Sequence, residues 1–306
     1  MRILRILGTT LSLGFIAILV WRDAGELPRL DMRASATWLW LCTGMIFYMF
    51  SQIVGAVAWR STLGVYEVTL PAGRAESQLL VSQIGKYIPG NVAHLFGRFA
   101  LARADGVAAG IVGSAMLLEV SVLLGVGLVL SGGLLIVLPE FRTALGQELG
   151  EAVVGPATMV FPVLLITALV AGQAILWHKA GRPRIEARRL VMPATLHTTN
   201  FAVLGLSLWS VVWAVHPTGG AEPLALLAIF TAAWVVGFLM PGTPGGIGIR
   251  DGIVALGLSL FMADGAALGV AVAHRAVATL GDVAIFGTGL TLRRRTDGSP
   301  KAPTLR

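Results

Sequence analysis

Two arginines follow two Pro-Gly pairs at the same spacing, with one pair in each half of the chain. Seven residues separate Gly90 from Arg98 and seven separate Gly242 from Arg250; the two copies lie 152 positions apart in a chain of 306 residues. A guanidinium group has a planar fork of donors that matches the oxygens of a phosphate. The spacing therefore predicts two phosphate-binding arginines, with a cytoplasmic membrane anchor as the alternative role for Arg98.

The apolar sequence around each Pro-Gly pair predicts a helix that breaks at membrane depth. Pro89 and Pro241 each remove a backbone donor, and Gly90 and Gly242 loosen the chain. A break also exposes the N-terminus of the next half-helix, whose free N–H groups and positive dipole end attract anions. Paired breaks in two halves of a membrane protein indicate a transport site built from inverted repeats.

Two further basic residues bracket the first break. Lys86 precedes it, and His94 follows it four residues before Arg98, so that His94 and Arg98 share one helical face. We expect Lys86 to meet a phosphate from the opposite half-helix, and His94 to join the same site. The alternatives are a lysine that snorkels to the membrane surface and a histidine that only packs.

The second break is rich in glycine. Four glycines lie within the seven residues 242–248, shortly before Arg250, and they leave backbone amides able to approach a ligand closely. Asp251 follows directly and could neutralise Arg250, which would make the pair structural. The segment lacks the Gly-Lys-Ser/Thr ending of a nucleotide-binding loop. The candidate substrate-binding residues are Lys86, Pro89, Gly90, His94, Arg98, Gly245, Gly246, Gly248, Arg250 and Asp251.

Three more charged residues stand deep in apolar segments, where charge is costly and usually functional. Glu119 lies near the middle of one predicted helix, and Arg275 and Asp282 lie seven residues apart on one face of the last helix. We expect a buried network that joins Glu119 and Asp282 to Arg275, Arg250 or His274. It would serve ion coupling or head-group binding, or alternatively would only fix helix packing.

The composition is that of an integral membrane protein. The chain is 56% hydrophobic and 13% charged, with a mean hydropathy of +0.80, whereas soluble domains carry about 25% charged residues. Its net charge of +7 reports topology rather than nucleic-acid binding. Six apolar segments predict full spans and two contain the breaks; the spans are 4–21 (an uncleaved first helix), 36–58, 107–138 (one helix or two), 156–177, 195–215 and 266–291, and the broken segments are 75–97 and 224–262.

The basic residues predict that the second half of the chain is inverted relative to the first. Arg2, Arg5, the basic loop 178–193 and Arg293 to Arg295 place both termini in the cytoplasm. Each half then has three spans and one broken re-entrant hairpin. Because three spans are an odd number, the second half starts on the opposite side of the membrane from the first and is inverted relative to it. The predicted fold is an all-α membrane domain over 1–291, with repeats at about 1–138 and 156–291 and a basic cytoplasmic tail at 292–306. The alternative to a repeat is that two Pro-Gly pairs recur by chance in a chain with 38 glycines.

No enzyme constellation is evident in the sequence. There is neither a metal-ligand spacing of His and Cys nor a nucleophile with a base, and no cofactor is expected. A membrane glycosyltransferase would need acidic pairs in its outer loops, for which Glu148 and Glu151 are the nearest candidates. Their surroundings favour a solvated loop.

The segments Gly85 to Val92 and Pro244 to Gly252, with Arg275 and Asp282, resemble the lysylphosphatidylglycerol synthase transmembrane (flippase-like) family. The resemblance covers nearly the whole chain, although Asp251 stands where many members have Glu. It implies translocation of an anionic lipid, either a phospholipid or a polyprenyl-phosphate-linked lipid, across the inner (plasma) membrane. Because only a short tail follows the last span, it implies translocation without lipid synthesis. A second copy of the chain or a lipid-modifying enzyme is a further candidate partner; the alternative functions are a membrane glycosyltransferase and a scaffold in lipid-linked glycan assembly.

Overall fold

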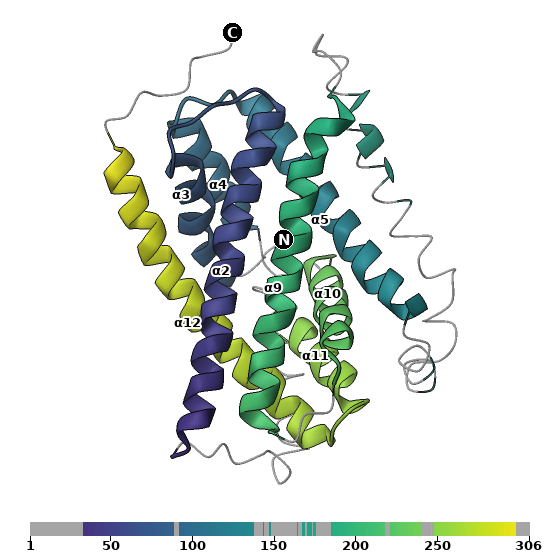
Figure 1. The fold of residues 1–306 in the computed structure, drawn as a ribbon. Helices are drawn as coiled ribbons and strands as arrows, with labels where there is room; N and C mark the ends of the chain where they lie inside the picture. Colours follow the sequence, from purple (N-terminus) through teal and green to yellow (C-terminus); the bar gives the residue numbers. More distant parts are fainter. Residues whose placement is uncertain are drawn as a thin grey trace, which may run out of the picture.

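Four long helices form the frame of the molecule (Figure 1). The computed structural model describes residues 33–88, 92–137, 185–217, 221–239 and 248–297, together with Gly246 and scattered positions between 143 and 175. Within these residues, four helices are long and apolar enough to cross a membrane. They are α2 (Ser35–Val65), α5 (Ala109–Val137), α9 (Val191–Val215, preceded by the 3-10 turn η2, Ala187–Leu190) and α12 (Asp264–Thr296).

These helices confirm four of the predicted spans. The segment predicted at 107–138 forms one continuous helix, α5, so a second break near its middle is excluded. The last helix, α12, continues to Thr296, five residues beyond the predicted end at 291. The predicted span 4–21 and most of 156–177 lie outside the described residues.

Both segments that contain a Pro-Gly pair fold as two helices with a break between them. The first unit consists of α3 (Arg74–Ser82), the 3-10 turn η1 (Gln83–Tyr87) and α4 (Ala93–Ala104). The second consists of α10 (Pro223–Leu239) and α11 (Ile249–Ser259). The interruptions fall where the sequence predicts them, although Pro89, Gly90, Pro241 and Gly242 themselves lie outside the described residues.

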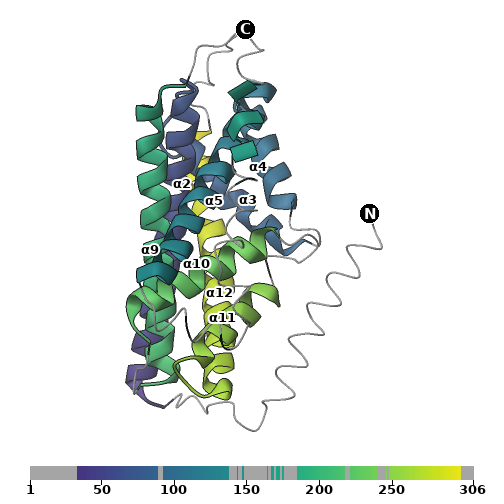
Figure 2. The ribbon, with the colours of Figure 1, turned by 90° about the vertical axis from the view of Figure 1, so that its right-hand side faces the viewer.

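The two broken units lie in opposite halves of the molecule (Figures 1 and 2). Helix α12 runs past both of them, packing against α3 and against α11, while α2 and α9 pack along each other. Each end has its own apolar core. One core joins α2, α3, α4 and α5, and the other joins α9, α10, α11 and the first half of α12. The inverted relation between the two halves of the chain stays a prediction.

Small residues let the helices approach closely, as is usual between helices in a membrane. A Cβ atom added to Gly281 would lie 2.6 Å from Cδ1 of Tyr48, and one added to Gly289 would lie 2.8 Å from Cβ of Leu80. These glycines therefore set how closely α12 packs against α2 and α3.

A cluster of charged side chains joins α3, the loop after α4 and the end of α12. Asp105 is buried and accepts hydrogen bonds from Arg74, Gln78 and Arg293 at 2.7 to 3.2 Å. Arg74 also donates to Asp297 at 2.6 Å, and this hydrogen bond lowers the pKa of the Asp297 carboxyl group. We call this the basic end of the molecule, and it is the end that the sequence predicts to be cytoplasmic.

Candidate functional site

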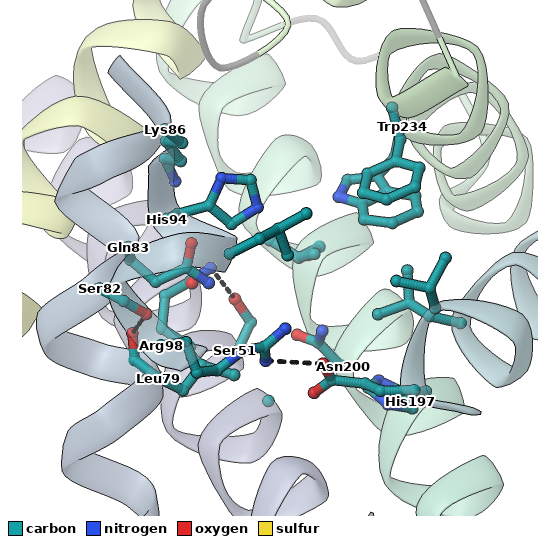
Figure 3. A pocket seen from close by; sticks show the side chains of 18 of the residues that line it. Ser51, Leu79, Ser82, Gln83, Lys86, His94, Arg98, His197, Asn200 and Trp234 are labelled. Atoms are coloured by element: carbon teal, nitrogen blue, oxygen red, sulfur yellow. Dashed lines mark hydrogen bonds and ion pairs between the residues drawn. The ribbon is translucent and has the colours of Figure 1, made fainter. Parts of the chain in front are cut away.

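A polar cavity lies between the two broken units and is lined by side chains from both of them (Figure 3). Its volume is about 140 Å³, and an ordered water needs about 10–15 Å³ of such space. The cavity thus has room for several waters or a small polar group. Its polar and aromatic lining includes Tyr48, Ser51, Gln52, Ser82, Gln83, Lys86, His94, Arg98, Glu119, His197, Asn200, Trp234, Phe238 and Arg250.

Both half-helices that begin after a break direct a basic side chain into this cavity. His94 stands in the first turn of α4, and Arg250 stands in the first turn of α11. The free N–H groups of a first turn carry a partial positive charge. The backbone and the side chains therefore favour the same sign of ligand charge.

Arg98 is held by an acid on the neighbouring α5. Its guanidinium lies 2.6 Å from Glu119 and 4.5 Å from the centre of the Trp59 ring. Arg98 is only 5% exposed, which does not fit an anchor at the membrane surface. The ion pair joins α4 to α5 directly beside the cavity.

Lys86 is held in the same way by an acid on α12. Its Nζ lies 2.7 Å from Asp282, which is fully buried and also accepts hydrogen bonds from Tyr48 at 2.9 Å and Tyr87 at 2.6 Å. The ammonium group lies over both tyrosine rings. This is a buried, paired lysine rather than a snorkelling one, and it ties the first break to α2 and α12.

Asp251 has two structural roles at the start of α11. Its carboxylate accepts a hydrogen bond from the N–H of Gly248 at 3.1 Å, which caps the helix. It also pairs with Arg275 of α12 at 2.7 Å. Gly248 has a φ of 91° and Gly246 a φ of 71°, a region that glycine enters without strain, so these two glycines shape the approach to α11.

Arg250 has no carboxylate within ion-pair distance among the described residues, unlike the three cations around it. Its Nε atom is buried, and within the described part of the chain it has no hydrogen-bond partner. Two glycines pack directly against Arg250: a Cβ atom added to Gly246 would lie 3.4 Å from Nε, and one added to Gly237 would lie 3.4 Å from Cβ of Arg250.

The structure corrects the predicted charge network, which becomes three separate ion pairs. Asp251 pairs with Arg275 rather than with Arg250, and Glu119 and Asp282 pair with Arg98 and Lys86. His274 contacts Ser207 and the ring of Phe230, with no acid among its described contacts. Chain spacing could not predict these partners because each pair joins two different elements.

Five of the thirteen predicted site residues line the cavity. They are Lys86, His94, Arg98, Glu119 and Arg250. Asp251, Arg275 and Asp282 lie behind this lining, as the partners described above. Pro89, Gly90 and Gly245 lie outside the described residues, as do Glu148 and Glu151.

The sequence prediction missed the contribution of α2 and α9. Ser51 and Gln52 of α2 and His197 and Asn200 of α9 line the cavity. The sequence did contain a signal for these four residues: they are polar residues in apolar spans, and such residues usually face the protein interior. His197 and Asn200 lie three positions apart, which puts them on one helical face.

The charges around the cavity leave an excess of one positive charge. Lys86, Arg98, Arg250 and Arg275 stand against the carboxylates of Glu119, Asp251 and Asp282. Within the part of the chain that the structure describes, no three His, Cys, Asp or Glu side chains come together as they would around a metal ion. The arrangement suits an anionic ligand that contacts Arg250.

Comparison with known proteins agrees with this architecture. Residues 5–285 match the family model described as lysylphosphatidylglycerol synthase TM region. Comparisons with curated proteins and with solved structures gave no match. The family match covers more than nine-tenths of the chain, and the four apolar helices have the length that a membrane region requires. The chain therefore belongs to the lysylphosphatidylglycerol synthase TM-region family, as an all-helical, multi-pass membrane protein.

Proposed function

We propose that the protein is a flippase or scramblase that moves an anionic lipid between the two leaflets of the membrane. The observation that carries the proposal is Arg250, a cation that lines the cavity and has no acid partner among the described residues. A buried charge without a partner is costly. An arriving phosphate would remove that cost and gain two parallel hydrogen bonds from the guanidinium fork.

The cavity between the two broken units provides a polar binding site for the head group between the leaflets. In the proposed arrangement, each unit enters the membrane from its own side, and the helix ends at the breaks face the cavity from opposite directions. The lipid tails stay in the bilayer, beside apolar surface such as Phe96 and Leu117. The ion pairs Lys86–Asp282 and Arg98–Glu119 hold the cavity wall, while Arg250 binds the phosphate.

The test is a leaflet-access assay in proteoliposomes that contain the pure protein. Fluorescent phosphatidylglycerol is placed in both leaflets, and the fraction that an external reductant reaches is followed over time. We expect Arg250→Gln to slow the exchange by roughly ten- to a hundredfold, because a hydrogen bond to a charged group is worth about 1.5–3 kcal/mol.

Arg294→Gln is the matched control, because it makes the same chemical change at an exposed position near the end of α12. Arg294→Gln should leave the rate of exchange unchanged. The rate of Arg250→Lys should lie between those of Arg250→Gln and the control, because lysine keeps the charge but lacks the planar fork of donors. A polyprenyl phosphate tested beside phosphatidylglycerol ranks the two classes of cargo. Exchange at the normal rate by folded, inserted Arg250→Gln protein would contradict the proposed role of Arg250.

A further inference from the structure

The lining of the cavity holds buried polar atoms that have no partner within the described residues. Both ring nitrogens of His197 and the Oδ1 atom of Asn200 are in this state, and so are Nδ1 of His94 and Nε of Arg98. All four residues line the cavity. Since more than 90% of buried polar groups in proteins are hydrogen-bonded, such a cluster needs a ligand or ordered water.

His197 and Asn200 form the core of this cluster (Figure 3). They lie on one face of α9, and His197 is 1% exposed. In Figure 3 they lie together at one end of the cavity, while Lys86 and His94 lie toward the other. The unpartnered atoms of His197 and Asn200 therefore lie apart from the ion pair between Lys86 and Asp282.

The unpartnered atoms require a ligand that both donates and accepts hydrogen bonds. Asn200 Oδ1 can only accept, and a neutral His197 has one acceptor and one donor nitrogen. A phosphodiester has no hydrogen to donate, so it cannot satisfy Asn200. An ammonium group could donate, but it would meet Arg98 and the net positive charge of the cavity lining. A hydroxyl group both donates and accepts, and it carries no charge.

We propose that His197 and Asn200 form a subsite for the hydroxyl groups of the lipid head, so that the cargo is an anionic phospholipid with a polyol or sugar head group. This proposal rests on the proposed function and names its substrate class. In this arrangement Arg250 binds the phosphate, and His197 and Asn200 of α9 bind the hydroxyl groups of the head group attached to it. Neither residue belongs to the two motifs that follow the breaks.

The test compares two lipids of equal charge, one with hydroxyl groups on its head group and one with a plain methyl group. Phosphatidylglycerol and phosphatidylmethanol are both phosphodiesters with one negative charge, but only the first has hydroxyls on its head group. We expect the wild-type protein to move phosphatidylglycerol about tenfold faster in the leaflet-access assay. The purified protein should also retain phosphatidylglycerol in preference to phosphatidylmethanol when lipid binding is measured by native mass spectrometry.

Substitutions on α9 then assign the preference to the subsite. His197→Phe and Asn200→Leu should each bring the ratio of the phosphatidylglycerol rate to the phosphatidylmethanol rate close to one. Thr198→Val alters an exposed residue of the same helix and should keep the preference. Because the comparison of lipids in the wild-type protein needs no variant, a variant that fails to fold leaves the test intact.

The outcomes separate this proposal from the proposed function. Equal movement and equal binding of the two lipids would overturn the subsite, leaving waters as its occupants, while the protein would remain a translocase. Preferential binding of phosphatidylglycerol without movement of either lipid would support the subsite and overturn the proposed function. If neither lipid moves and binding shows no preference, both proposals are overturned.

Discussion

At the scale of single residues, Asp282 is the acid that ties the first broken unit to α2 and α12. It is fully buried and accepts hydrogen bonds from Lys86, Tyr48 and Tyr87. We expect Asp282→Asn to lower the free energy of unfolding by about 3–5 kcal/mol, because the Lys86 ammonium is then left buried without its counter-charge. Unfolding of the purified protein in detergent, followed by circular dichroism against denaturant, measures this loss.

The double variant shows whether the charge is the cause. In Lys86→Met with Asp282→Asn, the unpaired ammonium is gone, so the loss should be smaller than for Asp282→Asn alone. A double variant that is less stable than Asp282→Asn would mean that Lys86 stabilises the fold through its packing over the tyrosine rings rather than through the ion pair.

The individual charged residues could be found from the sequence, but their partners could not. Glu119 and Arg250 stand out because a charge inside an apolar run is costly and is kept mainly where it has a role. Asp251 pairs with Arg275 of α12 rather than with its neighbour Arg250, and that choice depends on how α11 and α12 pack. His197 and Asn200 were missed because no motif marks them, although polarity within a span was a sufficient signal.

At the scale of helices, glycines on one face of α12 decide how closely it packs. A Cβ atom on Gly281 would lie 2.6 Å from the Tyr48 ring, and the hydroxyl of Tyr48 is held by Asp282 and Lys86. The ring cannot retreat without breaking these contacts. We expect Gly281→Ala to cost about 1–3 kcal/mol of unfolding free energy, as overpacking of a core does.

Gly287→Ala is the control for this prediction. Gly287 lies on the same helix, is exposed, and has nothing within 4 Å of an added Cβ atom. Because alanine is a better helix former by about 1 kcal/mol, this variant should be as stable as the wild type or slightly more stable. Equal stabilities for the two variants would contradict the close approach of α12 to α2.

The helix breaks were the most predictable elements, and the helix ends were less so. Proline and glycine act locally, so the two interrupted segments could be located without knowing the fold. The end of α12 depends instead on distant partners. Arg293 and Asp297 reach Asp105 and Arg74, and these contacts extend the helix to Thr296.

At the scale of the whole molecule, the two apolar cores lie at opposite ends and the polar cavity lies between them. Each core holds one broken unit against the long helices. The apolar packing is thus concentrated in the two cores, and the middle of the molecule remains polar. It also explains why the site draws on nearly every element, and why no single segment of the sequence could specify it.

The predicted topology places the two broken units on opposite sides of the membrane. Glu222, just before α10, should then face outward, and Arg295, near the end of α12, should face the cytoplasm. The test uses single cysteines at these positions after replacement of Cys42, an exposed and free thiol. A membrane-impermeant maleimide should label Glu222→Cys in intact cells, and should label Arg295→Cys only after the cells are opened. Labelling of both cysteines in intact cells would contradict the odd number of crossings predicted between them. It would thereby also contradict the predicted inverted relation of the two halves.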